Sequence, residues 1–109
     1  MRNFSKFVYV ASPFAGDVEE NVRKTKGYCK FVVDKGMVPM APHLHYPQFL
    51  DDNSPQEREL GLMFSLSLLS KCDELWVFGG ISKGVRGEID TAEKIGMPIR
   101  YFLEQTGDD

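Results

Sequence analysis

The stretch "LWVFGGISKGVRGEID", residues 75–90, joins a hydrophobic run to a glycine-rich turn and a polar segment. Four large or β-branched apolar residues in a row are typical of a strand that is buried on both faces. Gly79 and Gly80 open a turn after this strand, and a helix is expected over residues 85–95, with Gly96 as its stop. A buried strand, a tight turn and a helix in this order form the repeating unit of an α/β fold.

The same unit recurs along the rest of the chain. Asp17 and Ser54 are each followed three residues later by a glutamate, which is the pattern of a capping box at a helix start. Pro55 at a first helical position and Gly36 as a helix stop support helices over residues 17–36 and 54–70. Apolar runs predict strands over residues 7–11, 37–41, 74–78 and 98–103. The order βαβαβαβ predicts a parallel sheet, because parallel neighbours need a crossover connection.

Right-handed crossovers place the second strand on one side of the first, and the third and fourth strands on the other side. We therefore expect a three-layer, doubly wound, flavodoxin-like α/β domain over residues 1–103, with strand order 2-1-3-4. The helix over residues 17–36 would cover one face of the sheet alone and leave apolar surface exposed there. Residues 104–109 are expected to form a flexible tail.

Charge and composition exclude several classes of partner. With 109 residues and a formal net charge of -3, the chain has no general electrostatic attraction for nucleic-acid polymers. No apolar run approaches the length of a membrane span, and residues 1–6 lack the apolar core of a signal peptide. A cytoplasmic location is therefore expected, in which Cys29 and Cys72 would be free structural thiols rather than a disulfide.

The helix over residues 54–70 has apolar side chains around nearly its whole circumference. They are Leu60, Leu62, Met63, Phe64, Leu66, Leu68 and Leu69. Such a helix needs a second apolar surface, so we expect a homodimer or larger homo-oligomer with this helix in the interface. The alternative is a monomer whose tail or loops cover the same surface.

A ligand is expected at the carboxyl ends of the first and third strands, where the strand order reverses. Two loops meet there, over residues 12–17 and 80–88. Their candidates for substrate binding are Ser12, Phe14, Gly16, Ser82, Gly84 and Arg86. Because glycines let a ligand approach the backbone and a helix start attracts anions, one interpretation is a phosphate site completed by Lys83 or Arg86. The other is a glycine-rich turn that only makes a tight connection.

His43 and His45 follow the second strand and flank the same crevice, so both are candidate substrate-binding residues. Together with Asp51 and Asp52 they include the side-chain types that bind metals, but no third ligand has a clear spacing, and we expect no metal. We prefer the interpretation that this aromatic-rich loop stacks on or hydrogen-bonds a ligand. Aromatic residues that only pack the loop down are the alternative.

Glu88, at the end of the glycine-rich turn, has two interpretations. Acidic residues are favoured in the first turn of a helix by its dipole, which would make Glu88 a surface acid. However, Glu88 lies six residues past Ser82 and four past Gly84, where a reactive group would face the crevice.

Four segments carry a resemblance to a known family. They are Tyr9-Val10-Ala11-Ser12, His43-Leu44-His45-Tyr46-Pro47, Cys72-Asp73-Glu74-Leu75-Trp76-Val77-Phe78-Gly79 and Ser82-x-Gly84-x-x-x-Glu88-x-x-x-Ala92. Over most of its length the chain resembles the nucleoside 2-deoxyribosyltransferase-like superfamily, which includes 2'-deoxynucleoside 5'-phosphate N-hydrolases. It resembles most closely the short members of that superfamily that are grouped as a domain of unknown function.

The resemblance implies a nucleoside deoxyribosyltransferase-like fold that needs no cofactor and acts on a small-molecule nucleoside or nucleotide. It implies that Glu88 is the nucleophile that attacks the anomeric carbon, that Tyr9 helps to orient it, and that Ser82 contacts a 5'-phosphate. A retaining glycosidase works in the same way, since its carboxylate captures an oxocarbenium-like centre.

One position departs from the superfamily. Its enzymes carry an aspartate eight residues before the acid that matches Asp73, where it handles the proton of the departing base, and here that position is Ser65. A serine cannot serve as a general acid of matched pKa. Either another group substitutes, or the chain has kept the pocket and lost efficient chemistry. The candidate substitutes are Asp51, Asp52, Glu59, His43 and His45.

The first interpretation is therefore an enzyme that cleaves the N-glycosidic bond of a (deoxy)nucleoside or its 5'-monophosphate, or transfers the deoxyribosyl group. Hydrolysis is favoured over transfer because the chain is short. A non-catalytic nucleotide-binding or sensor module is the alternative, and the serine at position 65 favours it. A phosphoribohydrolase of the lysine-decarboxylase-like fold is a third option, but the Gly-Gly-x-Gly-Thr signature of that family is absent from the sequence.

Overall fold

The computed structural model describes residues 4–14 and 16–103, and within these ranges it confirms the predicted α/β architecture. The described strands form one parallel sheet in the expected order β2-β1-β3-β4. They are β1 (Phe7–Ala11), β2 (Val38–Met40), β3 (Glu74–Phe78) and β4 (Ile99–Phe102). The helices are α1 (Val18–Asp34), α2 (Pro55–Ser70) and α3 (Lys83–Lys94), with the short 3-10 turns η1 (Pro42–Leu44) and η2 (Tyr46–Gln48) after β2. The expected tail, residues 104–109, lies outside the described residues.

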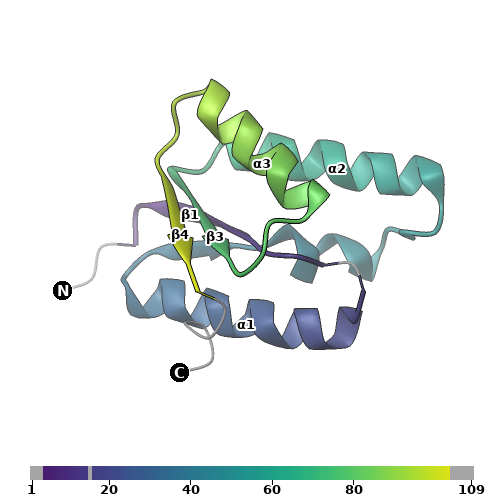
Figure 1. Cartoon of the computed structure of the whole chain (residues 1–109), viewed down its shortest axis with the longest axis horizontal. Helices are drawn as coiled ribbons and strands as arrows, with labels where there is room; N and C mark the ends of the chain where they lie inside the picture. Colours follow the sequence, from purple (N-terminus) through teal and green to yellow (C-terminus); the bar gives the residue numbers. More distant parts are fainter. Residues whose placement is uncertain (1–3, 15, 104–109) are drawn as a thin grey trace.

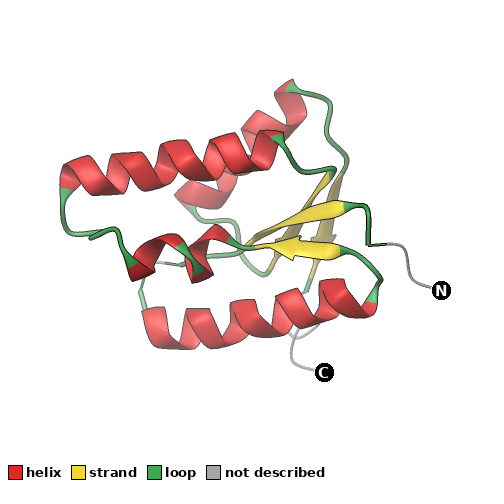
Figure 2. Cartoon of the chain, turned by 180° about the vertical axis from the view of Figure 1, so that it is seen from behind, coloured by secondary structure: helices red, strands yellow, loops and turns green. Residues whose placement is uncertain are grey.

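The elements form three layers. Helix α1 covers one face of the sheet, whereas α2 and α3 lie together on the other face (Figure 1). Figure 2 shows the same layers from behind, with the sheet between the helices. Crossovers between parallel strands are right-handed, and after β2 the chain crosses to the other side of β1. Helices α2 and α3 therefore lie on the opposite face of the sheet from α1.

The two central strands are buried on both faces, as their unbroken apolar sequences predict. Alternate residues point to opposite faces of the sheet. Val8 and Val10 pack in the α1 layer, whereas Tyr9 and Ala11 pack with residues of α2 and α3. The tyrosine of β1 is thereby directed into the layer that α3 covers.

The expectation that the α1 face would be left partly open is wrong. Trp76 and Phe78 on this face are only 1% and 0% exposed. Tyr28 stacks on Phe78 with the ring centroids 4.4 Å apart, and Phe31 and Phe102 pack around the same rings. Large aromatic side chains therefore close a face that a single helix covers.

Side-chain caps mark the start of each of the three described α-helices, and the predicted cap of α1 is the Asp17 carboxylate, which accepts a hydrogen bond from the Glu20 backbone N–H. The Ser82 hydroxyl oxygen accepts a hydrogen bond from the Val85 backbone N–H, so α3 begins two residues earlier than the sequence indicated. Ser54 caps α2 as predicted. The glutamate of that capping pattern, Glu57, accepts a hydrogen bond from the Asp51 backbone N–H and so ties the preceding loop to the first turn of α2.

Helix α2 exposes apolar side chains in the single chain. Leu62 and Met63 are 55% and 58% exposed, and three more large apolar residues of the helix are also exposed. We call this set the α2 apolar surface, and its members are Leu60, Leu62, Met63, Phe64 and Leu66. Several exposed apolar side chains on one helix are typical of an interaction site.

Cys29 and Cys72 are free thiols, as the sequence indicated. Burial raises the pKa of each to about 11. Because the thiolate is the reactive form, both cysteines are poor nucleophiles and act as packing residues. None of the described helices is long and apolar enough to cross a bilayer.

Candidate active site

Tyr9 and Glu88 form a buried pair between the centre of the sheet and α3. The Tyr9 hydroxyl donates a hydrogen bond to Glu88 Oε2 across 79 positions of sequence. Tyr9 is 0% exposed and Glu88 is 6% exposed. Glu88 lies on the inward face of α3 with Val85, Ile89 and Ala92, beyond the first turn of the helix. Its interpretation as a surface acid favoured by the helix dipole is therefore wrong.

The second carboxylate oxygen of Glu88, Oε1, is buried and has no hydrogen-bond partner among the described residues. A buried polar atom without a partner costs roughly 1–3 kcal/mol, so such atoms are rare in folded proteins. Oε1 therefore keeps lone pairs that no described group occupies, which is the property that a nucleophilic oxygen needs.

Burial controls the protonation of both side chains. It raises the pKa of Glu88 to about 7, and the hydrogen bond from Tyr9 acts in the opposite direction. Burial, followed by the charge of Glu88, raises the pKa of Tyr9 well above 10.0. Tyr9 therefore stays protonated and donates, while Glu88 exchanges its proton close to neutral pH. A carboxyl group whose pKa is perturbed in this way is typical of catalytic sites.

Ser65 of α2 is the third polar side chain of this cluster. It is 9% exposed and is therefore largely withdrawn from solvent. A hydrogen bond with the Ser65 side chain lowers the pKa of Tyr9, although burial raises this pKa by more. Position 65, where the sequence departs from the superfamily that it resembles, therefore lies beside the Tyr9 hydroxyl.

An open cavity of about 90 Å³ reaches Ser65, and we call it the Ser65 cavity. Its walls come from the connection between β1 and α1, from the η1–η2 loop and from α2. The lining residues that could contact a ligand through rings or polar groups include Phe14, His43, Asp52, Glu57, Arg58 and Ser65. Ser65 lines this cavity and also contacts Tyr9, whereas Tyr9 and Glu88 themselves do not line it.

The structure brings two of the predicted binding residues together in the Ser65 cavity. The rings of Phe14 and His43 stack with centroids 4.8 Å apart at an interplanar angle of 18°. Burial lowers the pKa of His43, against a smaller opposing effect of Asp52, so His43 is uncharged at neutral pH. His45, by contrast, is exposed, does not line the cavity, and contacts the rings of Tyr46 and Phe49.

Sequence reasoning singled out Ser65 but missed the rest of the α2 wall of the Ser65 cavity. Glu57, Gly61 and Ser65 follow one another at intervals of four residues, and Arg58 lies beside them. That spacing places small and polar residues on one side of an otherwise apolar helix. The interruption of the apolar pattern was the signal that could have identified this wall.

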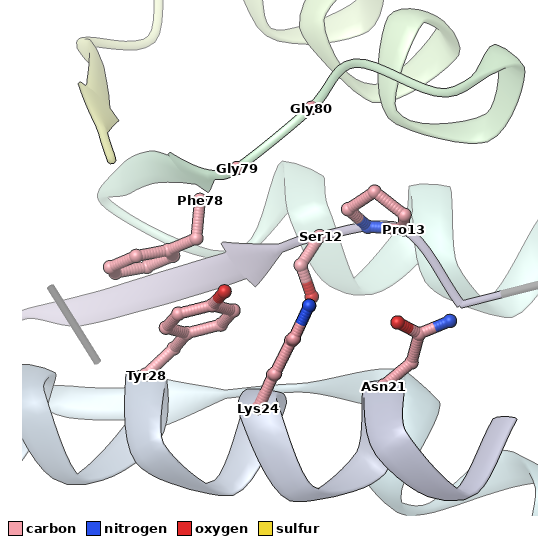
Figure 3. Close-up of a pocket in the computed structure, with 8 residues that line it drawn as sticks. All are labelled: Ser12, Pro13, Asn21, Lys24, Tyr28, Phe78, Gly79 and Gly80. Carbon is pink, nitrogen blue, oxygen red and sulfur yellow. The ribbon is translucent and has the colours of Figure 1, made fainter. Parts of the chain in front are cut away.

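A second cavity, of about 60 Å³, lies on the α1 face of the sheet, and we call it the Lys24 cavity (Figure 3). Of the predicted binding residues it contains Ser12, which is 3% exposed and pairs with Thr25 at 3.1 Å between the hydroxyl oxygens. Asn21, Lys24 and Tyr28 form its α1 wall and were not predicted. Their spacing of three and four residues on one helix face was the available signal.

The remaining predicted binding residues lie outside both cavities. Gly16, Ser82, Gly84 and Arg86 are all exposed, and none of them lines the Ser65 cavity or the Lys24 cavity. Gly16 has a φ of +98°, a conformation that favours glycine, so it has a structural reason for its position.

Two further features bear on alternative chemistry. Within the described ranges, no group of three or more histidine, cysteine, aspartate or glutamate side chains could hold a metal ion. The Asp73 carboxylate accepts a hydrogen bond of 2.8 Å from the Phe7 backbone N–H. Phe7 begins β1, so Asp73 lies at the end of the sheet opposite the crevice and has a structural role.

Comparison with known proteins identifies the family and the fold. A family model described as a domain of unknown function, DUF7768, matches residues 6–102. Among curated proteins no relative matches the chain. Among solved structures the chain is similar to a 2-deoxyribosyltransferase from the psychrotolerant bacterium Bacillus psychrosaccharolyticus, with 20% sequence identity and a TM-score of 0.70. That similarity covers 89% of this chain and 72% of the other, and it shows a deoxyribosyltransferase-like fold.

The raised pKa of Glu88 predicts how the stability of the protein depends on pH. Since burial raises this pKa from 4.5 to about 7, the unfolded chain loses the proton first as the pH rises. As the pH rises from 4.5 to about 7, the free energy of unfolding of the wild type should therefore decrease by about 3 kcal/mol more than that of Glu88→Gln. Urea denaturation of both proteins at pH 4 and pH 8 measures the difference.

Glu93→Gln is the matched control, because Glu93 is exposed on the same helix. The stability of this variant should follow that of the wild type at both pH values. Equal changes in the wild type and Glu88→Gln would show that Glu88 ionises as freely in the folded protein as in the unfolded chain.

Proposed function

The chain belongs to the DUF7768 family, and we propose that it acts on the N-glycosidic bond of a (deoxy)nucleoside or its 5'-monophosphate, with Glu88 as nucleophile. The observation that carries this proposal is the buried Tyr9–Glu88 pair, in which Oε1 has no described partner. The fold supports it, since the 2-deoxyribosyltransferase with the same fold is described as a biocatalyst for nucleoside synthesis.

The proposed reaction has two displacement steps. Glu88 Oε1 attacks the anomeric carbon, the bond from that carbon to the base breaks, and its electron pair leaves with the base, which takes up a proton. Water then attacks the resulting glycosyl ester in hydrolysis, or a second base attacks it in transfer, and the Glu88 carboxylate is released. Two displacements retain the configuration at the anomeric carbon. Tyr9 keeps Oε2 engaged throughout, so Oε1 is the reacting oxygen.

The departing base needs a proton that Ser65 is not acidic enough to supply. Of the candidate substitutes, His43 and Asp52 line the Ser65 cavity, whereas Asp51, Glu59 and His45 do not. Burial lowers the pKa of His43, which leaves it without a proton to donate at neutral pH. We therefore assign proton delivery to solvent that enters the open cavity.

A nucleotide-binding or sensor module without turnover is the second candidate function. Ser65 favours it, because this side chain lies beside Tyr9 at the position where the superfamily enzymes carry their acid. Such a module would bind a nucleotide with saturation and release no base from it. Release of free base therefore separates the two candidate functions.

We also propose that two copies of the chain associate through α2 and complete the site. The Ser65 cavity, at about 90 Å³, is well below the roughly 300 Å³ at which pockets for small-molecule ligands begin. One of its walls is α2, which extends past the carboxyl ends of the strands (Figure 1). A second copy packed on the α2 apolar surface would bury that surface and add a wall to the cavity.

The kinetic prediction concerns the release of base from deoxynucleosides and their 5'-monophosphates, followed by chromatography. The value of kcat/KM should rise with pH through about 7, because only the ionised form of Glu88 is nucleophilic. Glu88→Gln should lower the rate by about 10³-fold or more. Tyr9→Phe removes a hydrogen bond that lowers the pKa of Glu88, so the rising limb should move to higher pH.

Glu93→Gln again serves as the control and should keep the wild-type pH profile. Base release by Glu88→Gln at the wild-type rate would contradict the assigned nucleophile. Saturable nucleotide binding without base release from any substrate would favour the sensor instead.

The prediction for association uses a charge placed on the α2 apolar surface. The wild type should have twice the mass of one chain in light scattering, and Met63→Glu should have the mass of one chain, because a buried charge opposes contact. Ile95→Glu is the control, since Ile95 is also exposed, at 52%, but lies at the end of α3. A monomeric wild type, or a dimer that Met63→Glu leaves intact, would contradict this interface.

A further inference from the structure

We propose that the substrate of the Tyr9–Glu88 pair is a nucleoside or nucleotide whose base carries a fixed positive charge on its ring, as a pyridinium or an N7-alkylated purine does. This assignment rests on the proposed function and adds the class of leaving group. Two observations carry it. The described groups around the pair have no proton suited to a departing base, and the lining of the Ser65 cavity has a negative balance of charge.

The hydrogen bonds at the pair are directed toward Glu88 and leave no acid for a departing base. The Tyr9 hydroxyl donates its proton to Glu88 Oε2, and burial followed by the charge of Glu88 raises the pKa of Tyr9 well above 10.0. The Ser65 side chain is hydrogen-bonded to Tyr9 in turn. Since a serine hydroxyl is also too weak an acid, these groups hold the carboxylate and do not protonate a leaving group.

The lining of the Ser65 cavity supplies no matched acid either. Burial lowers the pKa of His43, so its imidazole is uncharged at neutral pH. Asp52 and Glu57 count as negative charges at pH 7, and a carboxylate has no proton to donate. Tyr46 is a phenol, which is a much weaker acid than a carboxylic acid. A neutral base must therefore take its proton from water.

A base with a fixed positive charge leaves without any proton. Glu88 Oε1 forms a bond to the anomeric carbon, the bond from that carbon to the ring nitrogen breaks, and its electron pair stays on the nitrogen. This pair cancels the positive charge of the ring, so the base departs as a neutral molecule. Water then attacks the glycosyl ester, loses a proton to solvent and releases the Glu88 carboxylate. Neither step needs a general acid.

The charge of the Ser65 cavity favours the same class of base. Asp52 and Glu57 contribute two carboxylates against the single guanidinium of Arg58, while His43 is uncharged. The charge of Asp52 raises the pKa of His43, although burial lowers it by more, so the field of this carboxylate reaches the ring on the cavity wall. Such a lining attracts a cationic base and gives a neutral base no comparable gain.

The test compares nucleosides that differ by one methyl group. The base of 7-methylguanosine carries a fixed positive charge, whereas that of guanosine is neutral. Each is supplied with ribose and with 2'-deoxyribose, and as the 5'-monophosphate. Release of base is followed by chromatography at neutral pH, and spontaneous hydrolysis is subtracted. The value of kcat/KM should be at least about 10²-fold higher for the methylated base, because general-acid catalysis contributes roughly 10²–10⁴-fold and only the neutral base needs it.

The outcomes separate this assignment from the proposed function. Equal values for the two bases, or a preference for guanosine, would overturn the assignment and leave the proposed function standing. Release of base from none of the compounds would contradict the proposed function, and the assignment with it. Nicotinamide riboside then distinguishes the two kinds of cationic base. A kcat/KM above that of 7-methylguanosine would identify a pyridinium substrate, and a lower value would identify a purine.

Two substitutions test the groups that carry the assignment. Ser65→Asp places a carboxyl group beside the Tyr9–Glu88 pair, where the two like charges keep one carboxyl group protonated. It should raise release of guanine from guanosine at least about tenfold and should not raise release of the methylated base. Asp52→Asn should raise the KM for 7-methylguanosine about fivefold and leave that for guanosine unchanged, because it removes an attractive charge.

Glu59→Gln is the matched control, because Glu59 is an exposed acid of α2 that does not line the Ser65 cavity. It should give the wild-type values for both bases. Circular dichroism shows whether Ser65→Asp is folded, and the exposed position of Asp52 keeps the second substitution informative if it is not. A folded Ser65→Asp without faster guanine release, or an unchanged KM in Asp52→Asn, would overturn the assignment.

Discussion

The hydrogen bond from Tyr9 to Glu88 Oε2 is the interaction on which the rest of the site depends. It joins the central strand β1 to α3 through a layer that is apolar apart from Ser65, in which a carboxyl group without a partner would be strongly destabilising. One oxygen is satisfied by this bond, while burial holds the other without a described partner and keeps the pKa of Glu88 near 7. The contact therefore joins α3 to the sheet and orients the carboxyl group, whereas burial brings its pKa near 7.

The fold could be predicted from the sequence because its determinants are local. Apolar runs mark the strands, Ser54 and Asp17 mark helix starts, and the handedness of crossovers then fixes the order β2-β1-β3-β4. The expectation of an exposed face beside α1 was wrong. The closure of this face depends on contacts such as that of Tyr28 with Phe78, which join distant segments of the chain. Those contacts have no local signature, so a count of helices underestimates what aromatic side chains can cover.

The candidate site was predictable only in part. The strand order and the family resemblance together indicate Glu88 and Tyr9, but only the structure shows that they meet, since they are 79 positions apart. The two histidines looked equivalent in sequence, yet His43 lines the Ser65 cavity and His45 faces solvent, because the 3-10 turns after β2 separate them. Lys24 sits on a helix that sequence reasoning assigned only to covering the sheet. The resulting account has two cavities on opposite faces of the sheet, divided by the connection from β1 to α1.

The central claim is that Glu88 Oε1 forms a bond to the sugar. The most direct test is mass spectrometry of the protein after incubation with a 2'-fluorinated nucleoside, because the electron-withdrawing fluorine slows hydrolysis of a glycosyl ester. The account predicts an added mass of one fluorinated pentosyl group on the peptide that contains Glu88, and no such addition in Glu88→Gln. A wild-type protein without the adduct, or with the adduct on a different residue, would contradict the account.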